Sequence, residues 1–263
     1  MTTPAATAAD GLDGPWSDER WDQQVRARLA ASIPELIPGA PAVGTITSWA
    51  DDVWFVDLVG GGRIVAKHQF YGIATRGEPY DLLRVEADTL RFLRARRAAV
   101  PLVFGIDPGA QLILLEFAGG QTFADVLATP PDHSTRQDLA HRALHELQFI
   151  ETQLANAAVA PVVPGGSLED LTAAWSPVAG LALDGLRRLW RKHCGQPLPN
   201  GLQHRIESLW RQLGARPPRR GITDYQPANI VVDEQHRRVT FLELAKLGWD
   251  WTERRAVQYT TSV

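Results

Sequence analysis

Three oxygen-bearing side chains follow one another in the last quarter of the sequence. Asp224 and Asn229 stand five positions apart, and Glu243 comes after the next apolar runs. Pro227 prevents a regular helix between Asp224 and Asn229, so both side chains are expected on an irregular loop. A carboxylate can orient and deprotonate a hydroxyl group, and oxygen atoms are the ligands that Mg²⁺ prefers. The pattern therefore indicates proton transfer beside a metal site.

Two short apolar runs are expected to bring these side chains together. Ile230–Val232 and Val239–Leu242 are typical of strands, and the polar run between them is typical of a turn. An antiparallel hairpin would return Glu243 to the side of Asn229, around one small space shared with Asp224. The alternative is an ordinary turn, in which Asp and Asn are both common.

An acid, four residues, an Asn and then a strand pair ending in a carboxylate is the order found in kinases. The segment resembles the catalytic and metal-binding loops of the aminoglycoside phosphotransferase and choline kinase-like family. The resemblance implies ATP as phosphate donor, Asp224 as catalytic base, and Asn229 and Glu243 as Mg²⁺ ligands. Two departures stand out: Ile222-Thr223 replaces the His-Gly that often precedes the base, and Glu243 replaces a metal-binding Asp.

A second pair of charged residues lies in the first half of the chain. Lys67 ends the β run Ile-Val-Ala-Lys and resembles the third-strand lysine of kinases. Glu86 falls on the same helical stripe as Leu82, Leu90 and Leu93. A carboxylate on a core-facing stripe is costly unless a cation meets it, so we predict an ion pair between Lys67 and Glu86. That pair would aim the ammonium group at phosphate oxygens.

The competing interpretation places Glu86 at the edge of the stripe. The carboxylate would then lie in water and pair with Arg84 or Arg94, which are close in sequence. Periodicity in a single sequence places helix faces only approximately. Both interpretations stay open at this stage.

The elements that must hold these side chains follow from periodicity and turn residues. Strands are predicted at 43–47, 53–59, 63–69, 101–104, 111–116, 230–232 and 239–242. Helices are predicted at 17–31, about 79–97, 122–127, 135 to about 157, 167–174, 181–193 and 202–213. The glycine run 60–62 is predicted to be a hairpin turn, because no Lys-Ser or Lys-Thr follows it. The loop at 48–52, which would cover the phosphates, lacks glycine.

The predicted fold class is α+β. The resemblance implies a two-lobed protein kinase-like fold, with a small antiparallel-sheet lobe carrying one key helix and a mainly helical large lobe. Residues 1–15 are expected to be disordered, 16–117 to form the nucleotide-binding lobe, and 118–263 to hold the catalytic loop, metal site and acceptor site. Backbone groups of Glu116 and Ala118, at the hinge between the lobes, are expected to hold the adenine edge of the nucleotide.

Composition narrows the class of protein. The formal charge of −3 argues against an electrostatic nucleic-acid binder, and no apolar run is long enough to span a bilayer. The single cysteine, Cys194, excludes an intrachain disulfide framework. We therefore expect a cytoplasmic protein with no nucleic-acid and no membrane partner.

The tail extends the resemblance and raises a question about partners. Gly248-Trp249-Asp250 resembles an element that follows the metal carboxylate in many bacterial members of the family. Twenty residues (263 − 243) follow Glu243, which makes the large lobe look short. A partner protein or a second copy is expected to complete it, or alternatively the insert 161–199 folds back as the wall of the acceptor site.

Three functions are compatible with these patterns. The leading prediction is an ATP- and Mg²⁺-dependent phosphotransferase acting on a hydroxyl of an aminoglycoside-like or amino-alcohol-like small molecule. The second is a kinase-like enzyme acting on peptide Ser or Thr in a peptide-modifying complex. The third is a pseudokinase that binds or scaffolds without transfer. Sequence spacing does not identify the acceptor.

Overall fold

The N-terminal part of the computed structural model packs a helix against a sheet. The structure describes residues 18–37, 39, 42–50, 52–69, 72–73, 79–128, 133–155, 157, 168–233 and 238–261, so the predicted disordered segment 1–15 lies outside the described residues. Helix α1 (Asp18–Leu36) runs five residues beyond its predicted end at 31, through Pro34. Pro34 removes one backbone donor, but Val25, Leu29 and Ile33 are buried and hold the helix against the sheet.

The sheet has five antiparallel strands in the order β1-β2-β3-β7-β6. The strands are β1 (Val43–Ala50), β2 (Val53–Leu58), β3 (Arg63–His68), β6 (Val103–Asp107) and β7 (Leu112–Glu116). Residues 60–62 form the predicted turn between β2 and β3, and all three glycines have positive φ, which glycine adopts without strain. On β3, Ile64 and Ala66 pack in the cluster with α1, while Val65 packs against the opposite cluster. Lys67 therefore faces away from α1.

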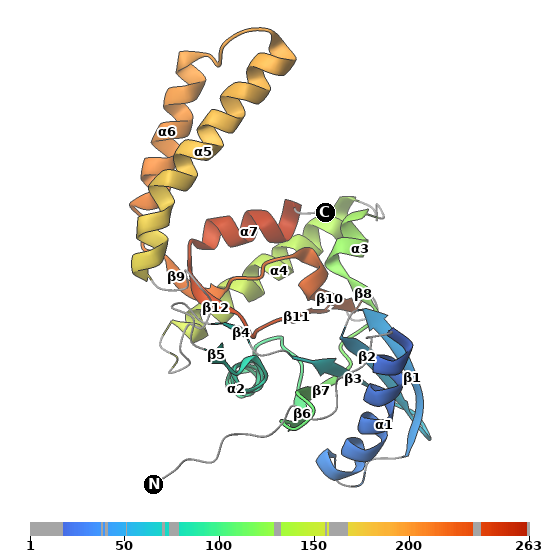
Figure 1. Cartoon of the computed structure of the whole chain (residues 1–263). Coiled ribbons are helices and arrows are strands. Elements are labelled where there is room, and N and C mark those ends of the chain that lie inside the picture. Colours follow the sequence, from blue (N-terminus) through green and yellow to red (C-terminus); the bar gives the residue numbers. More distant parts are fainter. Residues whose placement is uncertain are drawn as a thin grey trace, which may run out of the picture.

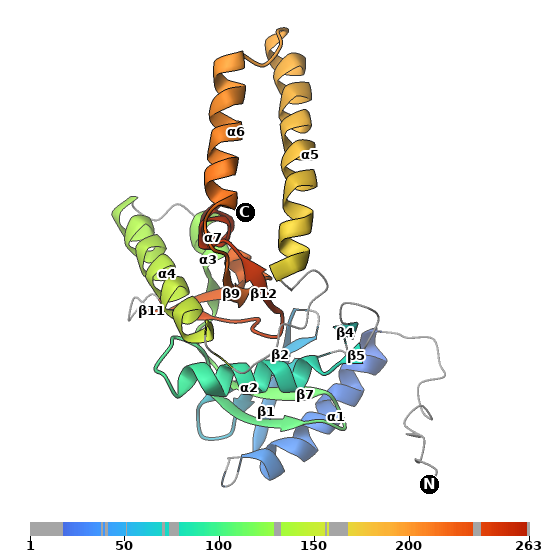
Figure 2. The same ribbon diagram turned by 90° about the vertical axis from the view of Figure 1, so that its left-hand side faces the viewer.

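Helix α2 (Leu82–Arg94) covers the other face of the sheet (Figures 1 and 2). The Asp81 carboxylate caps its start by accepting a 3.0 Å hydrogen bond from the Arg84 N–H. Leu90 and Leu93 are buried in one cluster with Ile113 and Leu115 of β7. A two-stranded ribbon, β4 (Gly72–Ile73) with β5 (Pro79–Tyr80), precedes the helix. The sheet is thus enclosed between α1 and α2.

The same hydrophobic cluster continues into the second half of the chain. There α3 (Phe123–Ala128) and α4 (His133–Leu154) pack beside a three-stranded sheet, in the order β11-β10-β8. Its strands are β8 (Gln121–Thr122), β10 (Ile230–Asp233) and β11 (Arg238–Phe241). The predicted hairpin is confirmed, because β10 and β11 pair antiparallel in the register Ile230 to Phe241.

A long helical hairpin projects from the body of the molecule (Figures 1 and 2). It consists of α5 (Leu168–Cys194) and α6 (Asn200–Gly214). The prediction of two helices at 167–174 and 181–193 is wrong, because α5 continues through Pro177. Pro177 has no N–H to donate to the carbonyl of Ala173. Ala173 is exposed, so water can donate a hydrogen bond to that carbonyl instead. The described part of the hairpin extends outward and does not fold back over Asp224 as a wall.

Several elements had no sequence prediction, and three of them lie around the loop of Asp224. Strand β9 (Arg219–Ile222) pairs antiparallel with β12 (Leu247–Asp250), and α7 (Thr252–Thr261) follows. The side chain of Arg255 on α7 is fully buried and donates to the carbonyls of Ile222, at 2.7 Å, and Gly248, at 3.2 Å. The Arg255 guanidinium therefore joins β9, which precedes the loop of Asp224, to β12, which follows Glu243.

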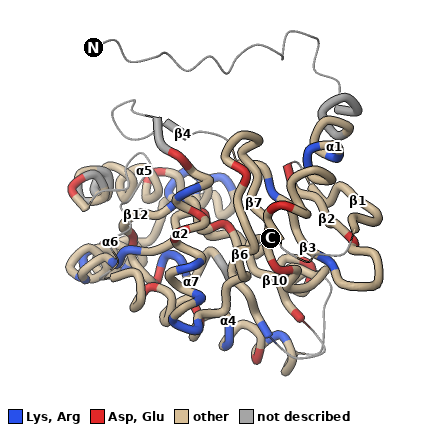
Figure 3. Tube along the Cα trace, turned by 90° about the horizontal axis from the view of Figure 1, so that it is seen from below, with Lys and Arg blue, Asp and Glu red and all other residues tan. Residues whose placement is uncertain are grey.

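Charged residues of both signs are interspersed over the body when the molecule is seen from below (Figure 3). Several form local pairs, such as Arg28 with Asp107 at 2.8 Å and Arg63 with Asp57 at 2.6 Å. Among the described residues, no helix is both long enough and apolar enough to cross a membrane.

Candidate active site

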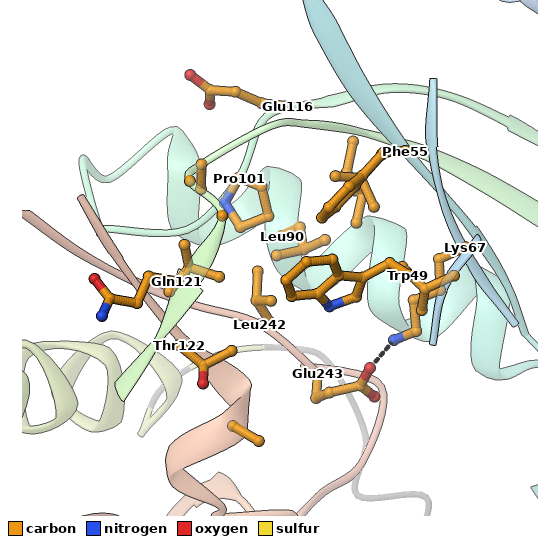
Figure 4. Close-up of a pocket in the computed structure, with 18 of the residues that line it drawn as sticks. Trp49, Phe55, Lys67, Leu90, Pro101, Glu116, Gln121, Thr122, Leu242 and Glu243 are labelled. Carbon is orange, nitrogen blue, oxygen red and sulfur yellow. Dashed lines mark ion pairs between the residues drawn. The ribbon is translucent and has the colours of Figure 1, made fainter. Parts of the chain in front are cut away.

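Lys67 lies at the centre of a network of charged side chains between the sheet and the C-terminal loops. Its Nζ is 3.0 Å from both carboxylate oxygens of Glu86. It also lies 2.5 Å from Oε1 of Glu243, and Figure 4 shows this second ion pair. Glu86 is only 1% exposed and also accepts a hydrogen bond from the Gln69 amide. The predicted ion pair is present, and the interpretation that left Glu86 in water is wrong. Arg94 pairs instead with Glu116, at 3.1 Å.

The electrostatics of this network favour a charged ammonium group. Burial opposes the charged form of Lys67, but Glu86 and Glu243 outweigh it and raise the pKa of Lys67 above its usual value. Burial raises the pKa of Glu86, and the nearby Glu243 adds to this, while Lys67 acts in the opposite direction. Lys67 therefore stays protonated at neutral pH and can meet anionic oxygens.

Glu243 reaches Lys67 because of an unusual backbone conformation. The residue has φ = 58°, in the left-handed region that residues other than glycine seldom adopt. The preceding Leu242 donates its N–H to the Asn229 carbonyl at 2.8 Å, which joins the end of the hairpin to the Asn229 turn. The turn thus directs the Glu243 carboxylate across the cleft toward Lys67, while its backbone stays next to Asn229.

Asp224 and Asn229 are held by a short loop after β9. A single 3-10 turn, η2 (Pro227–Asn229), replaces a regular helix, as Pro227 predicts. The Asn229 amide nitrogen donates to the Asp224 carbonyl at 3.1 Å, so its oxygen atom is oriented away as a potential ligand. Asp224 therefore projects from an irregular loop that Asn229 braces.

Lys246 is a further charged residue of the site that the sequence analysis did not identify. Its Nζ lies 2.9 Å from Oδ2 of Asp224, and this hydrogen bond, with the nearby charges of Asp224 and Glu243, raises the pKa of Lys246. Its position three residues after Glu243 was a possible signal, but only the pairing of β9 with β12 brings it beside Asp224. Two lysines thus face the three carboxylates of the site.

A cleft opens beside Lys67. Its lining is mainly apolar, with Trp49, Phe55, Leu90 and Leu242 among the residues in Figure 4. The rings of Trp49 and Phe55 lie 4.6 Å apart. Mainly apolar walls with a few polar groups are typical of sites that bind small molecules.

The two predicted hinge residues both line this cleft. Ala118 and Glu116 are part of its wall, and the Glu116 carboxylate lies far from Lys67 (Figure 4). The Glu116 N–H donates to the Leu102 carbonyl at 2.9 Å, and its carboxylate accepts from the Leu102 N–H at 3.1 Å. The side chain of Glu116 therefore stabilises the end of β7. Hydrogen bonding of adenine by the backbone atoms of Glu116 stays a prediction.

A second hollow lies on the other side of the Asp224 loop. It is lined by Ala124, Thr223, Asp224, Tyr225, Gln226, Pro227, Ala228 and Gln258. Ala228 lines both hollows, so the loop that carries Asp224 separates them. Lys67 and Asp224 therefore lie in hollows on the two sides of one loop.

The oxygen donors of the site fit a magnesium ion with few protein ligands. Among the described residues, no group of three or more His, Cys, Asp or Glu side chains could hold a metal ion. Mg²⁺ keeps several waters and phosphate oxygens, so two protein oxygens, such as those of Asn229 and Glu243, would be enough to hold it. The Glu243 side chain is 29% exposed, which leaves its carboxylate accessible from the cleft.

One comparison with known proteins identifies a family of enzymes, and another identifies structures with a similar fold. A family model described as the phosphotransferase enzyme family matches residues 42–251, which is most of the chain. No curated protein sequence matches. A solved structure of a putative aminoglycoside phosphotransferase from Ralstonia eutropha is 12% identical, with a TM-score of 0.51, and the match covers 86% of this chain and 66% of that one.

Two further solved structures are similar over most of their length. The aminoglycoside-3'-phosphotransferase of type VIII is 17% identical, with 90% and 81% of the two chains covered and a TM-score of 0.49. A putative fructosamine-3-kinase from Thermobifida fusca is 18% identical, with 89% and 83% covered and a TM-score of 0.48. The predicted α+β, kinase-like fold, with its small antiparallel sheet and its helical second half, is confirmed.

Proposed function

This chain belongs to the phosphotransferase enzyme family, and from that premise we propose that it transfers the γ-phosphate of ATP, with Mg²⁺, to a hydroxyl group of a small molecule. The observation that carries the proposal is that two hollows lie on the two sides of one loop. Lys67, fixed by Glu86, lies in one hollow, and Asp224 lies in the other. Such an arrangement positions a donor and an acceptor on either side of a carboxylate.

Each polar residue has a role that its contacts support. Lys67 would bind phosphate oxygens. Two carboxylates stabilise its charged form, and the ion pair with Glu86 holds it in position. Asp224 would orient the acceptor hydroxyl and take its proton. Asn229 and Glu243 would hold Mg²⁺, which would neutralise phosphate charge when it is bound. The phosphates would then be bound both by the metal that Glu243 holds and by the ammonium group of Lys67.

A pseudokinase is the second candidate, and a specific observation favours it. Glu243 and Asp224 are both engaged with lysines, at 2.5 Å and 2.9 Å. A protein that binds a ligand without transferring phosphate could keep both ion pairs intact. In an enzyme, the nucleotide phosphates would compete for Lys67 and release Glu243 to the metal.

A binding assay followed by a transfer assay separates the two candidates. The full chain is mixed with ATP, with and without Mg²⁺, and its melting temperature is measured. A Mg²⁺-dependent rise followed by ADP release with hydroxyl compounds or Ser/Thr peptides is expected for a transferase. A rise without any transfer, or no rise at all, would favour the pseudokinase and contradict the transferase.

Trp49 is expected to contribute to nucleotide binding. It lies in the cleft beside Lys67, where a ring can stack on the bound nucleotide (Figure 4). Because stacking of a base on an aromatic side chain contributes about 1–3 kcal/mol, Trp49→Ala should weaken ATP binding about tenfold or more. Calorimetric titration with ATP and Mg²⁺ measures the change. Trp190→Ala, on the projecting hairpin, is the matched control and should bind ATP normally.

Lys246 is expected to position Asp224. In Lys246→Met the carboxylate loses its 2.9 Å partner, and kcat should fall about tenfold because catalysis is sensitive to small displacements of reacting groups. Lys246→Arg should retain most of the activity, since it keeps a cation within reach. Steady-state kinetics at saturating ATP measure both variants, and equal rates for Met and the wild type would contradict this role.

A further inference from the structure

The hairpin of α5 and α6 buries little of its own apolar surface. It extends from the body, and of the described elements only α6 lies beside the outer half of α5 (Figures 1 and 2). None of the α6 side chains that the structure describes is buried, and between residues 181 and 194 of α5 only Leu183 is. Helices in proteins are stabilised mainly by burial of an apolar face, so a hairpin of this kind is expected to pack against a partner.

An apolar stripe runs along the exposed side of α5. Val178, Leu181 and Leu189 are 48%, 70% and 56% exposed, and Ala182 and Gly185 lie between them in the sequence. These five positions repeat every three or four residues, so they share one face of the helix. Exposed apolar residues that gather on one face mark a site of contact with another molecule.

The sizes of the side chains in this stripe are symmetric about a point between residues 183 and 184. Val178 and Leu189 are large and lie equally far from that point, and Ala182 and Gly185 are small and lie equally close to it. A two-fold contact between identical helices requires such symmetry, because residue i of one copy meets residue j of the other, and j meets i. The stripe therefore fits a second copy of α5 that runs in the opposite direction.

Gly185 has no evident role inside the single chain. A Cβ atom at this position would have no other atom within 4 Å, so a larger residue would fit. Glycine inside a helix costs about 1 kcal/mol relative to alanine. A second helix crossing at this point gives the glycine a role, because the distance between two packed helices depends on the side chains at their contact.

The charges along α5 favour the antiparallel direction. Residues 171–183 contain no Asp, Glu, Lys or Arg, whereas the run 187–192 is strongly basic. Asp184 pairs with Arg187 at 2.7 Å, and no carboxylate among the described residues pairs with the other basic residues of that run. A parallel pair would place the two basic runs side by side, where they repel. An antiparallel pair places each basic run beside the uncharged part of the other helix.

We propose that two copies of this chain associate through α5, packed antiparallel about a two-fold axis that passes between residues 183 and 184. Val178 of each copy then lies against Leu189 of the other, and Ala182 lies against Gly185. The proposal does not depend on the phosphotransferase function, because it uses no residue of the candidate active site.

The mass of the full chain in solution tests this contact. Sedimentation velocity over a range of concentrations should show an equilibrium between monomer and dimer. Leu181→Glu places a carboxylate in the stripe and should raise the dissociation constant at least tenfold, while the circular dichroism spectrum stays that of the wild type. Leu209→Glu is the matched control, because it adds the same charge to a leucine of α6 that is 62% exposed, and it should dimerise normally. Equal loss in the control would overturn the assignment to α5.

Gly185→Leu tests the close approach of the two helices. Leucine forms helices better than glycine and has room in the single chain, so the fold should be retained. The added side chain should separate the two copies and raise the dissociation constant at least tenfold. A wild-type chain that stays monomeric at every concentration would overturn the proposal, and so would normal dimerisation of both Leu181→Glu and Gly185→Leu.

Cross-linking tests the direction of packing. With the exposed Cys194 replaced by Cys194→Ser, chains carrying Val178→Cys are mixed with chains carrying Leu189→Cys and treated with a short thiol cross-linker. The mixture should give a covalent dimer and each variant alone should give little, because equal positions lie about 16 Å apart along antiparallel helices at 1.5 Å per residue. Preferred cross-linking of Val178→Cys alone, or a dimer that gives no cross-link in the mixture, would contradict the antiparallel contact.

Discussion

Asp224→Asn is expected to lower kcat for phosphoryl transfer by at least about 100-fold, because a positioned base contributes about 10²–10⁴-fold. The amide cannot take a proton, yet it has nearly the same shape and can still accept a hydrogen bond from Lys246. Asp224 is not part of the cleft that holds Lys67, so binding of ATP should persist. Stopped assays of product formation and calorimetric titration with ATP and Mg²⁺ measure the two effects separately.

A matched variant distinguishes loss of the base from loss of charge. Asp88→Asn changes the same functional group on the exposed side of α2, where the carboxylate has only a 3.7 Å contact with Arg91. This variant should transfer phosphate at the wild-type rate. Wild-type turnover in Asp224→Asn would rule out Asp224 as the base, and loss of ATP binding in that variant would show that its effect is structural.

Periodicity and residue order predicted some parts of the site. The expected single space around Asp224, Asn229 and Glu243 is not found, because Glu243 lines the cleft beside Lys67 and Asp224 lines the other hollow. The ion pair between Lys67 and Glu86 follows from a carboxylate on an apolar helical stripe, which requires a cation. The hairpin that places Glu243 after Asn229 follows from two short apolar runs. Both inferences use local patterns, and for that reason a single sequence was sufficient.

Other features depend on contacts that local patterns do not contain. The contact between Lys246 and Asp224 requires the pairing of β9 with β12, and β9 begins with two arginines, which do not resemble a strand. The positive φ of Glu243 turns its carboxylate toward Lys67, and no residue type predicted that conformation. The predicted break in α5 is wrong because one proline in an exposed helix can be tolerated when water meets the freed carbonyl.

The largest feature missed by sequence reasoning is a buried ion pair between Glu151 of α4 and Arg255 of α7. Both side chains are 0% exposed, and they are 104 positions apart in the chain. Thr252 also donates to Glu151, at 2.5 Å, so the carboxylate is fully engaged. A Cβ atom on Gly221 would lie 2.8 Å from the Arg255 guanidinium, so any other residue at this position would have to displace that group. The strand before Asp224 is therefore packed directly against the ion pair.

Removing one partner of this pair should strongly destabilise the fold. Glu151→Ala leaves the Arg255 charge buried without its carboxylate, and the free energy of unfolding should fall by about 3–5 kcal/mol. Arg255→Ala should cost at least as much, because the carbonyls of Ile222 and Gly248 lose their donor as well. Urea unfolding followed by circular dichroism measures both changes.

Two further variants determine whether charge or packing carries this effect. Arg254→Ala removes the neighbouring guanidinium, which is 37% exposed, and should cost less than about 1 kcal/mol. The double variant Glu151→Leu with Arg255→Met removes both charges and keeps the volume, so it should recover part of the stability lost in Glu151→Ala. Its transfer activity should stay below that of the wild type even where it is folded, because β9 and β12 lose the donor that holds Asp224 and Lys246 in register. Wild-type stability in Glu151→Ala would show that the buried pair does not hold these strands together.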